Sequence, residues 1–122
     1  METQTGLEEG ITQFNAGDFF ACHDTLEDVW MGLRGPDRSF FQGLIQVSVG
    51  YYHLSCENYP GAEHLLERGI QKLQLFPAQH RGVDIEDLLR QALQALVRVV
   101  EVREGKRETY TLEILPKIQI RD

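Results

Sequence analysis

The sequence lacks the features of a membrane-bound or secreted protein. No apolar run approaches the ~18 residues that a membrane-spanning helix requires. The first residues, METQTGLEEG, hold neither the basic region nor the apolar segment of a secretory signal. Positive charge is also scarce, with 12 lysines and arginines against 19 acidic residues and a formal net charge of −7. Because nucleic acids and anionic membranes are bound by clustered positive charge, we expect neither as a partner, and we expect a cytoplasmic protein.

Cysteine is rare, and its placement argues against disulfide bonds. Cys22 and Cys56 fall inside predicted helices without a CxxC spacing, so we expect two buried free thiols. The remaining composition is that of a globular protein, with 42% hydrophobic and 25% charged residues. A chain of 122 residues can form one hydrophobic core, and we therefore expect a single domain over residues 1–122.

Apolar residues recur at helical spacing through most of the chain. The pattern predicts an all-α bundle of about five helices in antiparallel hairpins, at about residues 7–15, 19–33, 38–58, 60–76 and 85–103. Asp37 is expected to cap the third helix, which is apolar around most of its circumference and should lie at the centre of the bundle. Consecutive helix pairs have a tetratricopeptide-like arrangement.

The pattern changes near the C-terminus. Tyr110, Leu112 and Ile114 alternate with polar residues, which is the period of an extended chain, and Pro116 interrupts it. We therefore expect an extended tail over about residues 108–122, which either lies against the helices or pairs with a second copy in a dimer. The earlier segment 77–83 is expected to be a polar loop, with His80 in solvent.

Polar residues interrupt the apolar face of the second predicted helix. His23 and Glu27 are four residues apart and so share a face, and Trp30 lies on the same side one turn further on. The third helix carries a polar stripe that consists of Gln42, Gln46 and His53. Together these residues predict a buried cluster or pocket between helices, with the candidate residues His23, Asp24, Glu27, Trp30, Gln42, Gln46, His53 and Asn58.

The cluster has two interpretations. In the structural one, which the sequence favours, His23 and Glu27 bond each other and the polar stripe, and fix the register of the helices. In the functional one, they face a pocket and act either as a general base and its partner carboxylate or as metal ligands. A buried imidazole and a buried carboxylate both need partners, so either arrangement would satisfy them.

The spacing of histidines and carboxylates excludes the standard metal motifs. HDTLE is not HExxH, and no histidine lies three residues after a glutamate. His23 and Glu27 would need further ligands from other helices, so we predict neither a metal nor a cofactor. The sequence also lacks a nucleophile elbow, a phosphate-binding loop and a dinucleotide fingerprint.

The segments FNAGDFFACHDTLEDVW and FFQGLIQVSVGYYHLSCENYPGAEHLLERGIQKL, with the late Leu115-Pro116, resemble domain-of-unknown-function family 309. The resemblance is strongest over residues 14–73. It implies an all-helical bundle without an established activity. The positions that match the family's polar pattern are His23, Asp24, Glu27, Gln42, Gln46 and Asn58, with Trp30 and Gly61 beside them. The chain departs from the pattern at Asp24, where glutamate is usual.

Two hypotheses for function follow. The first is a binding or self-associating module, with an unknown protein or small molecule as its partner or with a second copy in a homodimer. The second is a hydrolase-type or metal-assisted enzyme that acts on a small molecule, with His23 as the base or ligand and Glu27 as its partner. The sequence leaves the substrate, the partner and the oligomeric state open.

Overall fold

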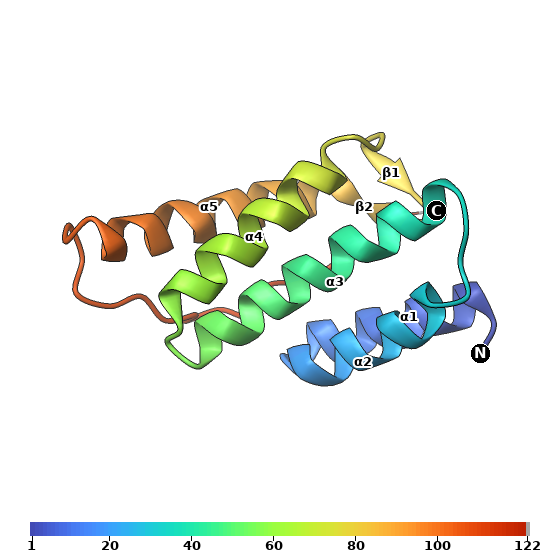
Figure 1. Cartoon of the computed structure of the whole chain (residues 1–122), viewed down its shortest axis with the longest axis horizontal. Helices are drawn as coiled ribbons and strands as arrows, with labels where there is room; N and C mark the ends of the chain where they lie inside the picture. Colours follow the sequence, from blue (N-terminus) through green and yellow to red (C-terminus); the bar gives the residue numbers. More distant parts are fainter. Residues whose placement is uncertain (122) are drawn as a thin grey trace.

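The computed structural model describes residues 1–121 and confirms the all-α prediction (Figure 1). Asp122, the last residue of the predicted tail, lies outside the described residues. The elements in chain order are α1 (Thr3–Asn15), α2 (Phe19–Trp30), α3 (Pro36–Ser55), α4 (Tyr59–Leu73), β1 (Gln79–His80), β2 (Val83–Asp84) and α5 (Ile85–Arg103). None of the helices in this described part is long and apolar enough to cross a lipid bilayer.

Side-chain caps determine where most helices begin. Asp18, Asn58 and Asp84 each accept a hydrogen bond from a backbone N–H in the first turn of α2, α4 and α5. The side chain of Glu2 caps α1 in the same way, by accepting from the N–H groups of Gln4 and Thr5. The first helix therefore begins four residues before the predicted start.

The start of α3 corrects the prediction for Asp37. Gly35 occupies the cap position with a φ of 75°, a conformation that favours glycine, and Pro36 takes the first helical position. Asp37 therefore lies in the first turn of α3 rather than at its cap. Its carboxylate is free to bond elsewhere in the fold.

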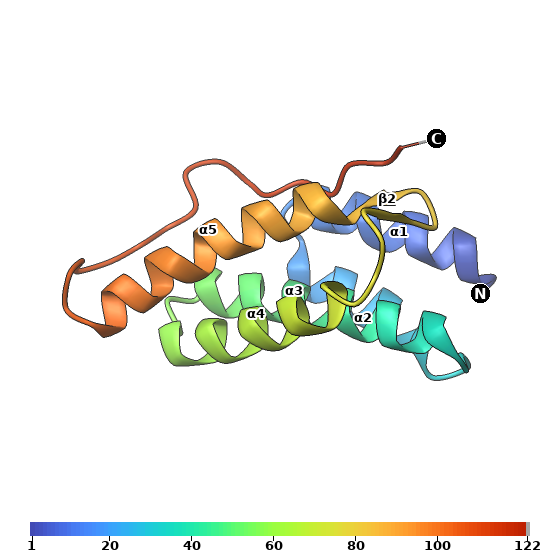
Figure 2. The ribbon, with the colours of Figure 1, turned by 90° about the horizontal axis from the view of Figure 1, so that it is seen from above.

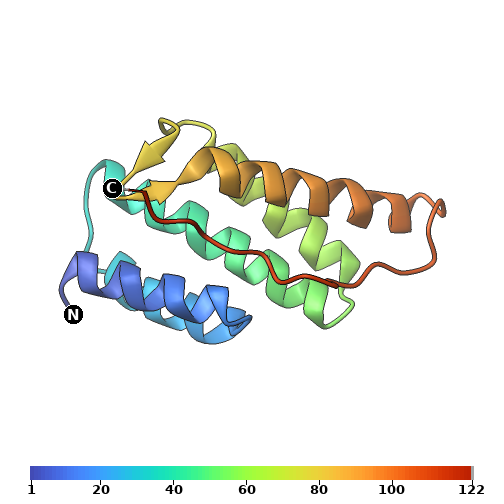
Figure 3. The same ribbon diagram turned by 180° about the vertical axis from the view of Figure 1, so that it is seen from behind.

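The helices form two layers, which Figure 2 shows from the side. In one layer α3 lies between α2 and α4, and in the other the C-terminal tail lies between α1 and α5 (Figures 1 and 3). The core between the layers is centred on α3, whose buried side chains include Phe40, Phe41, Leu44, Val47, Tyr51 and Leu54. The prediction that the third helix is central is confirmed.

Close packing of α3 on α4 depends on glycine. A Cβ atom added to Gly69 would lie 2.9 Å from the backbone oxygen of Gly43 and 2.9 Å from the backbone nitrogen of Val47. No side chain fits at that separation, so Gly69 lets the two backbones approach. This contact also fixes which residues of α4 lie beside which residues of α3.

The segment after α4 is a short hairpin rather than the predicted loop. β1 and β2 pair antiparallel, and Val83 forms a bridge with Ile120 of the tail. The tail is further held by Asn15, whose side chain donates to the backbone oxygen of Ile118 and accepts from its N–H. Ile118 is buried at 3% exposure. The tail therefore lies against the helices, as one of the two sequence-based alternatives predicts.

Candidate functional site

The outer face of the α2–α3–α4 layer is the surface on which the sequence-predicted polar residues meet. Here "outer face" means the side of these three helices that points away from α1, α5 and the tail, and that faces the viewer in Figure 1. Three shallow hollows lie on it, on either side of α3. We call them the central, aromatic and basic hollows.

The central hollow, of about 150 Å³, lies between α2 and α3 and is lined by Glu27, Trp30, Gln42, Ile45 and Gln46. Four of these five are residues that the sequence predicts to form a cluster. Within residues 1–121, the Nε1–H of Trp30 and the Oε1 of Gln46 are buried and have no hydrogen-bond partner. One unpartnered donor and one unpartnered acceptor are therefore buried beneath the central hollow, which the Glu27 carboxylate also borders.

The Trp30 ring is held rigidly in this hollow. The Arg38 guanidinium stacks over the ring at 3.9 Å from its centroid. The same guanidinium donates to the backbone oxygens of Trp30 and Leu33, at 3.0 and 3.1 Å, and so satisfies the end of α2. The orientation of the indole is therefore set by the start of α3 and does not depend on a bond to its N–H.

The basic hollow, of about 210 Å³, lies on the other side of α3 and is lined by Gln46, Arg68, Gln71, Lys72 and Leu75. Gln46 thus borders both the central and the basic hollow. No carboxylate among residues 1–121 lies within ion-pair distance of Arg68 or Lys72. The sequence analysis missed these two residues, because nothing local distinguishes them from other solvent-exposed helix charges.

The aromatic hollow, of about 190 Å³, is lined by Phe19, Phe20, His23, Val49, Tyr52 and His53. The Nδ1 atom of His23 lies 3.2 Å from Oδ1 of Asp24, and its Nε2 atom lies 3.2 Å from Oε2 of Glu27. Its Nδ1 forms no aligned hydrogen bond to any described residue. The structure therefore brings His23 within ion-pair distance of Asp24 and Glu27, but the three side chains do not form a hydrogen-bonded network.

The prediction that this cluster is buried is wrong. The side chains of His23, Asp24 and Glu27 are 23%, 61% and 47% exposed. The residues of α2 that point into the core are Phe19, Cys22, Leu26 and Val29. His23 and Glu27 each follow one of these by a single position, which turns their side chains about 100° around the helix. They therefore lie at the rim of the α2–α3 groove.

His53 and Asn58 serve the turn between α3 and α4. The Nδ1 of His53 and the Nδ2 of Asn58 are 3.2 Å apart, and the Asn58 side chain accepts from the N–H of Gly61. A Cβ atom on Gly61 would lie 2.6 Å from Asn58 Nδ2. Asn58 is exposed and lines none of the hollows, so its position is that of a helix cap.

The family assignment follows from comparison with known proteins. Residues 7–65 match DUF309, a domain of unknown function. The chain is therefore similar to DUF309 over residues 7–65. This confirms the resemblance, which the sequence analysis placed over residues 14–73. The matched range includes all of α2 and α3, so the central and aromatic hollows lie within the DUF309 match.

Two relatives share this similarity. The uncharacterized protein YpuF of Bacillus subtilis (strain 168) is 32% identical over 108 residues, which are 87% of this chain and 60% of YpuF. An uncharacterized protein of Aquifex aeolicus (strain VF5) is 22% identical over 83 residues, 67% of this chain and 25% of that protein. The chain thus spans less than two thirds of the length of either relative.

The chemistry available on the outer face is limited. His23 lies between two carboxylates. Within residues 1–121, no group of three or more His, Cys, Asp or Glu side chains is placed to hold a metal ion. Cys22 is buried against Ser48, and burial raises the pKa of its thiol to about 11, so it is a poor nucleophile.

Two further predictions need correction. Cys56 is exposed rather than buried, because it caps the C-terminal end of α3 at the surface. His80 is only 27% exposed, and its Nε2 lies 2.9 Å from Oδ1 of Asp37. Its ring packs against the rings of Phe40 and Phe76, with centroids 4.7 and 5.2 Å away. His80 therefore belongs to the contact between the hairpin and α3.

Asp37 is the centre of that contact. The Nε of Arg81 donates to Oδ2 of Asp37 at 3.1 Å, and the Nη1 of Arg81 donates to Gln4 on α1 at 2.8 Å. Hydrogen bonds from Arg81, and then from His80, hold the pKa of Asp37 below its usual range. This cluster joins α1, α3 and the hairpin at the end of the molecule away from the aromatic hollow, and we assign it a structural role.

Proposed function

We propose that this protein is a protein-binding module and that the outer face of the α2–α3–α4 layer is its binding surface. The unpartnered Trp30 N–H and Gln46 carbonyl in the central hollow carry the proposal. A buried polar group without a partner costs about 1–3 kcal/mol. Both atoms are covered by neighbouring protein atoms, so a partner would remove this cost only after nearby side chains rotate aside. It would then offer an acceptor to Trp30 and a donor to Gln46, and a carboxamide or peptide group offers both.

The size of the hollows favours a protein over a small molecule. A site that encloses a small ligand usually measures about 300–1,000 Å³, whereas the three hollows measure about 150, 190 and 210 Å³ and are shallow. They are spread along α3 instead of converging on one point. Exposed apolar side chains, Phe20 at 52% and Leu75 at 83%, border the aromatic and basic hollows. Such a surface suits a macromolecule better than a substrate.

The hydrolase-type alternative has less support. A larger hollow, of about 500 Å³, lies between α5 and the tail, and none of the candidate residues lines it. Its two arginines, Arg98 and Arg107, both pair with Glu101. His23 has carboxylates beside it, but no serine, threonine or cysteine lines the aromatic hollow as a nucleophile. The arrangement supports recognition better than covalent catalysis.

Site-specific photo-crosslinking tests the proposal. A photoreactive benzophenone amino acid is placed at Phe20 on the outer face, and in a control protein at Val97 on α5. Both positions are 52% exposed, so the two probes have matched access to solvent. We expect covalent protein adducts from position 20, in purified protein and in the cells in which the protein is native, well above those from position 97. Equal yields from both positions would refute the proposal.

A further inference from the structure

We infer that the outer face binds a second copy of the same chain, as a twofold dimer whose axis runs parallel to α3. This inference rests on the proposed function and names the partner of that surface. In this arrangement α2 of each copy lies over α4 of the other. Two features support it. Certain residues of α2 and α4 lie at the same position along the axis of α3, and opposite charges lie on the two sides of that helix.

Contacts on both sides of α3 place one acidic residue, Glu27, and one basic residue, Arg68, at the same position along the axis of α3. On the α4 side, Gly69 packs against Val47, so its neighbour Arg68 lies beside the middle of α3. On the α2 side, Glu27 shares the central hollow with Gln46. Arg68 shares the basic hollow with the same Gln46. Glu27 and Arg68 therefore flank Gln46 from opposite sides and are separated by α3, so they cannot pair within one chain.

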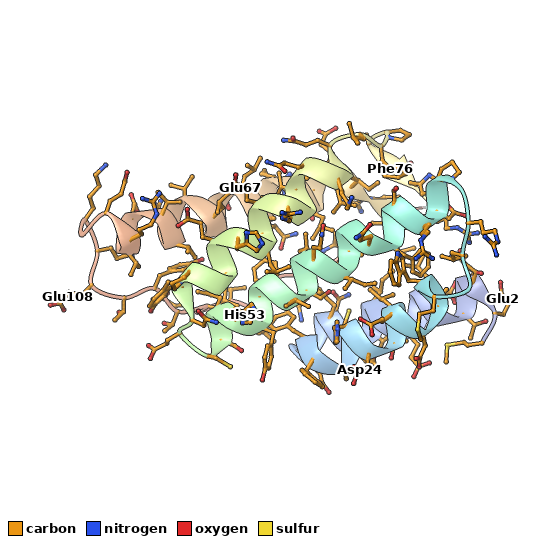
Figure 4. The ribbon with its side chains drawn as sticks, in the orientation of Figure 1. Glu2, Asp24, His53, Glu67, Phe76 and Glu108 are labelled. Carbon is orange, nitrogen blue, oxygen red and sulfur yellow. The ribbon has the colours of Figure 1, made fainter. Side chains whose placement is uncertain are left out.

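The two edges of the outer face carry opposite charges. Helix α2 carries three carboxylates, of which Glu27 borders the central hollow while Asp24 and Asp28 are exposed. The α4 edge next to α3 has Arg68 and Lys72, which no described carboxylate neutralises. Glu67 lies at the other edge of α4, away from α3 (Figure 4). Apart from Arg38, whose guanidinium stacks over Trp30 and bonds the end of α2, the acidic groups lie on the α2 side of α3 and the basic groups on the α4 side.

This segregation selects one twofold axis over the other. A half-turn about an axis parallel to α3 places α2 of one copy over α4 of the other. Each residue keeps its position along the axis of α3. Glu27 of one copy then faces Arg68 of the other, twice per dimer. A half-turn about an axis across α3 would place the three α2 carboxylates of one copy against those of the other. Because juxtaposed like charges disfavour association, the parallel axis is the complementary one.

Gln46 lies next to this axis and would meet its own counterpart. Two symmetry-related carboxamides can bond reciprocally, each Oε1 accepting from the Nε2 of the other. Gln46 Oε1 has no partner among residues 1–121 and is covered by neighbouring atoms, so this pairing requires the Gln46 side chain to rotate toward the outer face. Single buried amides set register and partner number in helical assemblies in the same way. The dimer therefore accounts for a polar atom that the isolated chain leaves without a bond.

The surface is large enough for a dimer of ordinary size. α3 has 20 residues, so it is about 30 Å long, and three helices packed 8–10 Å apart make a face roughly 25 Å wide. The outer face thus offers on the order of 700 Å² per copy, close to the ~800 Å² per partner of a standard protein interface. The exposed Phe20 and Leu75 would supply apolar contact near its edges.

Sedimentation of charge-reversed variants tests the dimer. Glu27→Arg places a positive charge opposite the Arg68 guanidinium of the second copy, and Arg68→Glu places a negative charge opposite its Glu27 carboxylate. We expect the wild-type chain to sediment at twice the mass of one chain, and each variant to dimerise at least about tenfold more weakly. Glu9→Arg on α1 makes the same charge change on the other layer and serves as the control. Circular dichroism checks that every variant is folded.

Mixing the two charge-reversed variants tests directly whether Glu27 of one copy faces Arg68 of the other. In a mixed dimer, the arginine introduced at position 27 of one copy would face the glutamate introduced at position 68 of the other. The second contact would keep the native pair of Glu27 and Arg68, so both contacts would be attractive. We expect a mixed dimer to form at concentrations where each variant alone is monomeric, and no such rescue when Glu9→Arg replaces Glu27→Arg.

Two results would overturn the inference. One is a wild-type chain that is monomeric at all concentrations, and the other is a dimer that neither variant weakens. Cross-links from position 20 to a different protein would in that case leave the proposed function standing. The two proposals can therefore fail separately.

Discussion

Replacing Gln46 with methionine should make the isolated chain more stable, although it removes a polar group from a helix of the core layer. The Oε1 of Gln46 is buried without a partner in residues 1–121 and borders two hollows. An unsatisfied buried polar group costs about 1–3 kcal/mol. Because Gln46 is only partly buried, we use the lower end of that range. Gln46→Met should therefore raise the free energy of unfolding by about 1 kcal/mol.

A second glutamine provides a control with the same chemical change and the opposite expectation. Gln91 on α5 donates from Nε2 to the Asp87 carboxylate and to the backbone oxygen of Lys117, at 2.7 and 2.8 Å. Its Oε1 accepts from the Lys117 N–H at 3.1 Å. Gln91→Met would remove these bonds and leave the Lys117 backbone without partners. We expect this variant to lose about 1–2 kcal/mol of unfolding free energy.

Urea-induced unfolding, followed by circular dichroism, measures both effects. The protein concentration must lie well below that at which dimers form, because a dimer would stabilise the wild-type chain by mass action. The reasoning would be refuted if Gln46→Met lowered the free energy of unfolding as much as Gln91→Met does. That result would mean that the Gln46 amide is satisfied within the chain and that the α2–α3 polar residues form a structural network.

Three other predictions concern single side chains. Asp37→Asn should lower the free energy of unfolding by about 1–2 kcal/mol at pH 7, because the bonds from Arg81 lower the pKa of Asp37 in the folded state. That contribution is present above the unfolded-state pKa of about 4 and is lost as the pH falls. The gap between variant and wild type should therefore close in urea titrations near pH 3. His23→Ala should change the same quantity by less than about 1 kcal/mol, because no aligned hydrogen bond holds the imidazole. A thiol reagent should titrate exposed Cys56 in the native protein, and buried Cys22 only after denaturation.

Much of the fold could be predicted because helices and their caps depend on residues that are close together in the sequence. The 3.6-residue apolar period predicted five helices, and the caps Asp18 and Asp84 stand directly before apolar runs, where aspartate is a favoured cap. The early start of α1 was missed because glutamate is an uncommon cap. The hairpin was missed because each strand has only two residues, too few to show a period.

The candidate site depends on contacts between distant parts of the chain, and these could not be predicted. The sequence places Trp30 on the same side of its helix as Glu27 and places Gln46 on the polar stripe of the third helix, but it does not show that both border one hollow. The burial of the cluster was overestimated because a shift of one position on α2 moves a side chain from the core to the rim. His80 was assigned to solvent because its partner Asp37 is 43 residues away in sequence.

The indole N–H of Trp30 allows the most direct test of the outer face as a binding surface. Trp30 is the single tryptophan of the chain, so its ¹⁵N–¹H resonance needs no assignment by mutation. NMR spectra are recorded over a dilution series of the purified protein. The dimer predicts that this resonance shifts with concentration, with the midpoint that sedimentation gives. A resonance that stays unchanged while sedimentation shows association would contradict the account.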